Sequence, residues 1–173
     1  MGVFMNRNNK GVTLVELMVV IAIMVVLAGT SLVGFRMIST RPAKECADRL
    51  KIALTSDRTT AMGKFNTEVY LYAEANGTIF LEENIYNTAT DITKKTSRVG
   101  DSDVTVTYSI DGTDPTNPLP MVAGGGGGLK LSFNRSTGGL KDYSGDVKIK
   151  CSKSGKSYLV TIYSITGKIV IEE

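Results

Sequence analysis

The side chains that most often carry catalytic chemistry are scarce in this sequence. It contains no histidine and two cysteines, Cys46 and Cys151. Without histidine, neither a Ser-His-Asp triad nor a Cys-His pair can form, and the HExxH metalloprotease motif is excluded. Two cysteines are too few for a zinc site of four thiolates. We therefore predict that the protein is not an enzyme and has no metal site and no cofactor.

Cys46 and Cys151 are 105 positions apart (151 minus 46). If the part of the chain that carries them lies outside the cytoplasm, a disulfide bond between them is chemically allowed and could tie a helix to a sheet. The alternative is a pair of buried free thiols, because cysteine is among the residue types most often buried. Neither is expected to act as a nucleophile, since no histidine can activate it.

A cluster of lysines lies near the C-terminus, interleaved with tyrosines. It consists of Lys148, Lys150, Lys153 and Lys156. Because apolar residues alternate with the first of these lysines, one interpretation is the exposed face of a half-buried strand. The other is a weak DNA-binding patch, although a formal net charge of +3 is too small to predict a nucleic-acid partner.

The ionisable side chain with the least usual surroundings is Glu16. Residues 17–35 are nineteen consecutive positions without a charge, and Glu16 is the single charge between residues 12 and 35. Twenty-four helical residues reach about 36 Å, which exceeds a bilayer core of about 30 Å. An ionised side chain at that depth costs roughly 2.5–3.5 kcal/mol on insertion scales. Glu16 therefore needs a partner, and this stretch contains no basic residue.

Three interpretations of the N-terminal region compete. The stretch is a plain membrane anchor, or it is the apolar part of a signal peptide cut near Ala28 or Gly29, although such parts have about 7–15 residues. In the third, the leader MGVFMNRNNKG is cut after Gly11, and Val12 then carries a new α-amino group. That amine, from a neighbouring copy, could neutralise Glu16.

Residues 10–23, KGVTLVELMVVIAI, resemble the class III leader motif of type IV pilins and pseudopilins. The resemblance implies that a prepilin peptidase cuts after Gly11 and methylates Val12, and that Glu16 aids assembly. Val12 departs from the phenylalanine that the family most often has at this position. Basic residues flank both sides of the apolar stretch, so the orientation with the N-terminus inside is also implied by the resemblance.

Residues 43–64 continue with the periodicity of an amphipathic helix. The apolar positions, spaced by three and four, are Ala43, Cys46, Ala47, Leu50, Ala53, Leu54 and Ala61. The opposite, polar face is expected to carry Lys44, Asp48, Lys51 and Asp57. Pro42 fits the first turn of this segment or marks a kink in one long helix. Gly63 is expected to end it.

Beyond residue 63 the apolar period changes to two, which indicates β-strands. Two β-rich runs around Asn76-Gly77 predict a hairpin. Further strands are expected at 103–110, 129–133, 147–151, 157–165 and 168–171, and without intervening helices they form antiparallel sheet. Residues 111–128 hold three prolines and six glycines and are expected to form no regular element. The glycines are not a phosphate-binding loop, because Leu129 and Lys130 follow them in place of Gly-Lys-Ser/Thr.

Two further pairs of segments resemble the GspH/FimT class of minor pseudopilins. The first pair is ADRLKIALTSDRTTAMGK with NTEVYLY, and the second is LKLSFNRSTGG with SYLVTIYSITGKIVI. The resemblances imply an α+β, pilin-like fold, in which a long N-terminal α-helix, hydrophobic in its first half, packs on a C-terminal antiparallel β-sheet or β-sandwich domain. The expected divisions are a cleaved leader at 1–11, the helix at 12–64 with 12–35 in the membrane or filament core, and the β domain at 65–173.

The function that the resemblance implies is mechanical. The protein is expected to be a structural subunit, a minor pilin or pseudopilin, of a type IV pilus or type II secretion-like filament. The alternative is a competence-type minor pilin that binds DNA during uptake. Implied partners are other pilin subunits, prepilin peptidase, an inner-membrane assembly platform and, before assembly, membrane lipid. The implied location is the cell membrane, crossed once, with an extracytoplasmic C-terminal domain, and then a surface pilus or pseudopilus.

Overall fold

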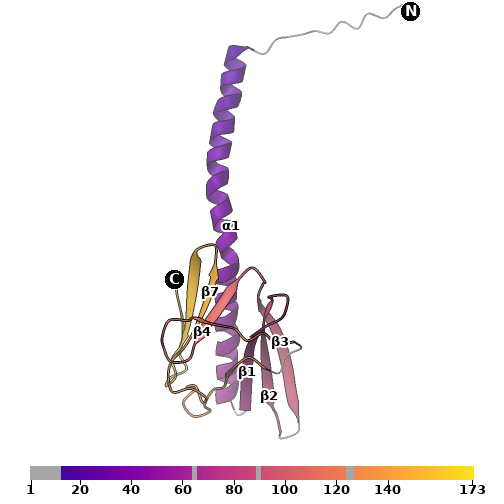
Figure 1. Cartoon of the computed structure of the whole chain (residues 1–173), viewed down its shortest axis with the longest axis vertical. Coiled ribbons are helices and arrows are strands. Elements are labelled where there is room, and N and C mark those ends of the chain that lie inside the picture. The colour runs from indigo at the N-terminus through magenta and orange to yellow at the C-terminus, as the bar shows by residue number, and fades with distance from the viewer. Residues whose placement is uncertain (1–12, 64–65, 89–90, 124–126) are drawn as a thin grey trace, which may run out of the picture. The chain divides into compact units, whose positions relative to one another are not determined.

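The computed structural model describes residues 13–63, 66–88, 91–123 and 127–173, and the side chains of 28–40 are left aside. The chain divides into two compact units, one ending at Ile38 and the other comprising Ser39–Glu173. The described residues form one helix and nine strands (Figure 1). Gly11 and Val12, the residues of the predicted cleavage site, lie outside the described residues.

The helix, α1, spans Leu14–Met62 and contains Pro42 in its interior. It ends before Gly63, whose N–H donates to the carbonyl oxygen of Thr59 at 3.0 Å. Gly63 directly follows Met62, the last helical residue. This position agrees with the prediction that Gly63 ends the helix, because glycine has a low helix propensity. Among the described residues, no helix is both long enough and hydrophobic enough to cross a membrane.

The strands form two antiparallel sheets within the second unit (Figure 1). The first sheet has the order β3-β2-β1-β6, with β1 at Asn66–Ala73, β2 at Ile79–Tyr86, β3 at Ile92–Gly100 and β6 at Leu129–Leu131. The second has the order β5-β4-β7-β8-β9, with β4 at Thr105–Ser109, β5 at Asn117–Pro118, β7 at Val147–Lys153, β8 at Lys156–Ile162 and β9 at Ile169–Glu172.

The predicted hairpin is confirmed. β1 and β2 pair from Asn66 opposite Tyr86 to Ala73 opposite Ile79, and Gly77 in their turn has a φ of 82°. This left-handed conformation favours glycine, which explains why the Asn-Gly pair located the turn.

Two strands were not predicted. β3 has five exposed residues at its start, so the alternation that marks a half-buried strand is missing from the sequence ITKKTSRVG. The expectation that residues 111–128 form no regular element is wrong at Asn117–Pro118, which pair with Tyr108 and Thr107 as β5. Proline is tolerated there because β5 is an edge strand, where one side of the backbone needs no ladder partner.

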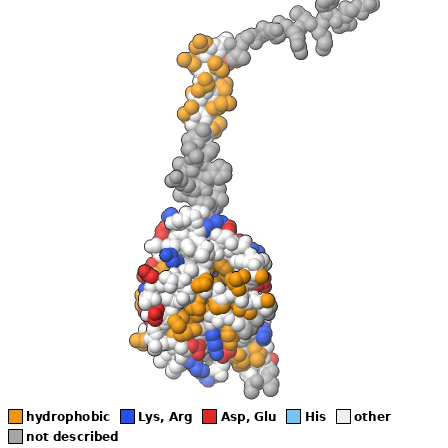
Figure 2. Space-filling view, viewed as in Figure 1, with side chains coloured by type: hydrophobic (Ala, Val, Ile, Leu, Met, Phe, Trp, Pro, Cys, Tyr) orange, Lys and Arg blue, Asp and Glu red, His pale blue; other side chains and the backbone are white. Residues whose placement is uncertain are grey.

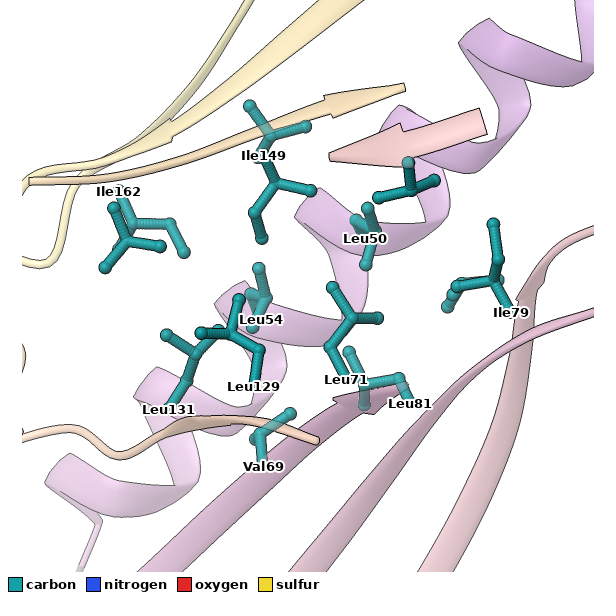
Figure 3. Close-up of a cluster of buried hydrophobic side chains, with 14 of the residues drawn as sticks. Leu50, Leu54, Val69, Leu71, Ile79, Leu81, Leu129, Leu131, Ile149 and Ile162 are labelled. Atoms are coloured by element: carbon teal, nitrogen blue, oxygen red, sulfur yellow. The ribbon is translucent and has the colours of Figure 1, made fainter. Parts of the chain in front are cut away.

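The core lies where α1 meets both sheets (Figure 3). Leu50 and Leu54 of α1 are fully buried, as is the rest of the predicted apolar stripe except Ala53, which is partly buried. They face side chains of the first sheet and of the second, among them Leu71 and Ile149 (Figure 3). Each such buried side chain stabilises the fold by about 1.5–3 kcal/mol. The expected α+β, pilin-like architecture is confirmed.

The placement of Asp57 on the polar face of the helix is wrong. Its side chain is fully buried. Asp57 follows Leu54 by three positions and precedes Ala61 by four, so helical geometry puts it on the apolar stripe whatever its polarity. The spacing of apolar residues predicted the stripe, but Asp57 was left out of it because its side chain is charged.

Candidate functional site

The N-terminal end of α1 is closed by hydrogen bonds between Thr13 and Glu16. The N–H of Glu16 donates to Thr13 Oγ1 at 3.2 Å. In return, Glu16 Oε2 accepts from the Thr13 N–H at 3.3 Å and from its hydroxyl at 3.4 Å. Thr13 precedes the first helical residue and Glu16 is the third, so this arrangement is a capping box.

The capping box gives Glu16 a role within its own chain that the sequence analysis missed. The signal was present, because Thr-x-x-Glu before an apolar run is the sequence signature of a helix N-terminus. The carboxylate also lies in the first turn, where the helix dipole favours a negative charge. Glu16 therefore has hydrogen-bond donors in the isolated subunit before any neighbour approaches.

The first turns of α1 carry apolar side chains on every side. The large apolar residues between Leu14 and Val25 are 45–72% exposed, with Val20 at the low end and Leu14 at the high end (Figure 2, orange). A helix that is hydrophobic all round requires a cover of lipid or protein. Within the described residues these side chains are exposed, so they are suited to contact with lipid or with apolar side chains of another protein.

The fold brings the two cysteines together. Cys46 lies on α1 and Cys151 on β7, both are buried, and their Sγ atoms are 3.3 Å apart. The hydrogen bond from Cys151 to Cys46, together with burial, raises the pKa of the Cys151 thiol far above its ordinary value. The raised pKa leaves Cys151 unsuited to nucleophilic chemistry in the folded protein, and Cys46 is 1% exposed.

The C-terminal lysines do not form one free basic surface. Lys148 and Lys150 lie on the half-buried face of β7, opposite the fully buried Val147 and Ile149. Lys153 pairs with Asp103, and Lys156 Nζ lies 2.6 Å from Glu173 Oε1. Two of the four lysines thus have carboxylate partners within the chain. No observation on this surface favours DNA binding.

A buried acidic pair lies between α1 and the first sheet. Among the described residues, neither carboxylate oxygen of Asp57 has a hydrogen-bond partner of normal geometry. Burial raises the pKa of Asp57 to about 7, the nearby charge of Glu83 on β2 adds to this, and the Thr67 hydroxyl opposes it. No three side chains of the described residues gather as a metal site would need. The raised pKa of Asp57 links protonation of this carboxyl group to folding stability.

Arg58 of α1 holds together two loops at one end of the domain. Its Nε donates to the carbonyl oxygen of Gly138 at 3.1 Å, and its Nη2 donates to that of Thr166 at 3.0 Å. The loops approach so closely that a side chain at Gly167 would meet the Gly138 carbonyl. Gly138 of the RSTGG segment and Gly167 of the SITGK segment therefore have a structural role, because a side chain at either position would disturb this packing.

Comparisons with known proteins gave two findings, one for the N-terminal segment and one for the fold. Residues 6–32, which include Gly11, Val12 and Glu16, match the family model of the prokaryotic N-terminal methylation motif. The search of curated proteins found no match to this chain.

Among solved structures, the chain resembles that of the minor pseudopilin EpsH from the type 2 secretion system of Vibrio cholerae. The match has a TM-score of 0.50 and 11% sequence identity, and it covers 75% of this chain and 94% of EpsH. At this identity the likeness concerns the fold. The chain therefore carries the prokaryotic N-terminal methylation motif at residues 6–32, and its fold resembles that of a minor pseudopilin.

Proposed function

We propose that this protein is a structural subunit, a minor pilin or pseudopilin, of a type IV pilus or type II secretion-like filament. The observation that carries the proposal is the methylation motif at residues 6–32 on a chain whose domain has the fold of a minor pseudopilin. The apolar side chains that surround the first turns of α1 support it, because a filament core or a bilayer would cover them. The role is mechanical and not enzymatic.

In this proposal, residues 1–11 are a leader that prepilin peptidase removes between Gly11 and Val12, after which Val12 is methylated. Residues 12–35 cross the cell membrane once, which the uncharged run of residues 17–35 supports, and the domain lies outside the cytoplasm. An inner-membrane assembly platform then moves the apolar segment from lipid into the core of a surface pilus or pseudopilus. There, the apolar side chains of other pilin subunits replace lipid.

Glu16 has two successive partners in this sequence of events. In the separate subunit, the Thr13 cap holds its carboxylate. In the filament, the methylated amine of a neighbouring Val12 neutralises it. Inside an apolar core such a pair is strongly attractive, and removing one partner leaves an uncompensated buried charge.

The mature N-terminus tests the processing step. Mass spectrometry of protein from bacterial envelopes is expected to find a chain of 162 residues (173 minus 11) that begins at Val12 and carries one added methyl group. Because the proposed cut follows Gly11 directly, a Gly11→Val variant is expected to keep its leader. An intact Met1, or a first residue near Ala28, in the wild-type protein would rule the proposal out.

Substitutions at Glu16 separate its two roles. Glu16→Gln keeps a side chain that can accept the capping hydrogen bonds but removes the charge, whereas Glu16→Ala removes both. If charge pairing drives assembly, both variants are processed and both enter filaments at roughly a tenth of the wild-type level or less, since about 1.4 kcal/mol is tenfold. The measurement is the ratio of filament-bound to membrane-bound protein by immunoblotting. Normal incorporation of Glu16→Gln would leave capping as the residue's role and refute the pairing.

A further inference from the structure

We propose that Cys46 and Cys151 form an intramolecular disulfide bond that ties α1 to β7. Their Sγ atoms are 3.3 Å apart, and a disulfide bond is about 2.05 Å long, so the two sulfurs need to approach by roughly 1.3 Å. They are the two cysteines of the chain, so the pairing has no competitor within it.

The surroundings of the two sulfurs suit a structural bond and not a redox-active one. Cys46 is 1% exposed and Cys151 is 0% exposed. Gly100, at the end of β3, closes the site, because a Cβ atom there would lie 3.0 Å from Cys46 Sγ. A disulfide in so closed a site resists exchange with external thiols, since an attacking thiolate cannot reach either sulfur.

The chemistry requires an oxidant of the disulfide class, either a protein thiol–disulfide oxidoreductase or a small-molecule disulfide. One cysteine thiolate attacks the oxidant's S–S bond and forms a mixed disulfide, and the second cysteine displaces the remaining thiol. The two cysteines together lose two electrons and two protons, and the oxidant is reduced to two thiols. This step rests on the proposed function, because a domain outside the cytoplasm meets oxidants of this class.

The timing follows from burial. Attack requires a thiolate, and the folded core opposes both ionisation of Cys151 and access to it. The bond therefore forms while the chain folds and before α1 closes on the second sheet. Protein that has folded in its reduced form is expected to oxidise slowly.

The direct test uses the full-length protein, extracted in detergent from bacterial envelopes in the presence of N-ethylmaleimide and then denatured without reductant. The expected result is no alkylation, an intact mass two hydrogens below the sum for free thiols, and a peptide that links residues 46 and 151. Alkylation of both cysteines would overturn the proposal. The same spectrum also identifies the N-terminal residue. A methylated Val12 with free thiols would overturn the disulfide alone. An intact Met1 with the linked peptide would overturn the proposed function alone.

A second measurement does not depend on the host. Wild-type protein refolded with oxidised glutathione is expected to unfold about 5–15 °C higher than the same protein refolded in dithiothreitol, because the bond closes a loop of about one hundred residues. The matched control is the double variant Cys46→Ala/Cys151→Ala, in which the two conditions are expected to give the same midpoint. Equal midpoints for the wild type would overturn the proposal, as would a shift of the same size in the double variant.

Discussion

An Asp57→Asn variant is expected to be more stable than the wild type by about 1–3 kcal/mol at about pH 8, and to lose this advantage towards about pH 5. The carboxyl group of Asp57 is fully buried between α1 and the first sheet. Asparagine has almost the same shape and no charge, and its amide could donate to the Glu83 carboxylate nearby. The variant would therefore relieve a charge that the native fold does not accommodate.

The sign of the pH dependence follows from the pKa of Asp57, which is raised from 3.8 to about 7. Between these values the folded state holds the proton and the unfolded state does not, so stability falls as pH rises through this window. Burial is the main cause, and the charge of Glu83 adds to it. A shift of this size sets an upper limit of about 4 kcal/mol, and relaxation around the ionised group lowers it.

The measurement is the urea midpoint of the wild type and the variant at about pH 5, 6 and 8. The wild-type midpoint is expected to fall with pH and that of Asp57→Asn to stay nearly level. Asp48→Asn is the matched control, because Asp48 lies on the same helix but is exposed. Parallel curves for wild type and Asp57→Asn would show that another group causes the pH dependence.

A Gly167→Ala variant is expected to lose roughly 3 kcal/mol or more of stability. Gly167 has a φ of 63°, and a Cβ atom there would overlap the carbonyl oxygen of Gly138 and lie 2.8 Å from Arg58 Nε. The loops would have to separate, which would also disturb the hydrogen bonds that Arg58 donates to Gly138 and Thr166. Two costs therefore add, one of backbone conformation and one of contact.

Gly155→Ala isolates the first of these costs. Gly155 has a φ of 80°, but a Cβ atom there would have no neighbour within 4 Å. Its substitution is expected to cost about 1–2 kcal/mol, the ordinary penalty for a left-handed alanine. Thermal or urea unfolding of both variants gives the comparison. Equal losses at the two positions would mean that the contact between the loops contributes nothing.

Features that depend on neighbours in the chain could be predicted. The Asn76-Gly77 turn and the stripe that contains Leu50 follow from local backbone chemistry and from side-chain periodicity, and both are present in the structure. Prediction from the pattern of apolar and polar residues failed where an exposed strand lacked alternation and where a charged residue was buried. β3 is a strand with little apolar alternation because it lies at a sheet edge, and Asp57 is a charged residue on a buried stripe.

The N-terminal segment is the part of this protein that its sequence determined alone. The match to the methylation motif lies within residues 6–32, and the helix cap joins Thr13 to Glu16, so both depend on residues that are close together in the chain. Tertiary structure decided the contacts between residues that are far apart in the chain. It brought Cys46 within 3.3 Å of Cys151, placed Asp57 beside Glu83 and set Gly167 against Gly138. Such contacts join residues far apart in the chain, and packing against a common core, which no local pattern specifies, decides which of them meet.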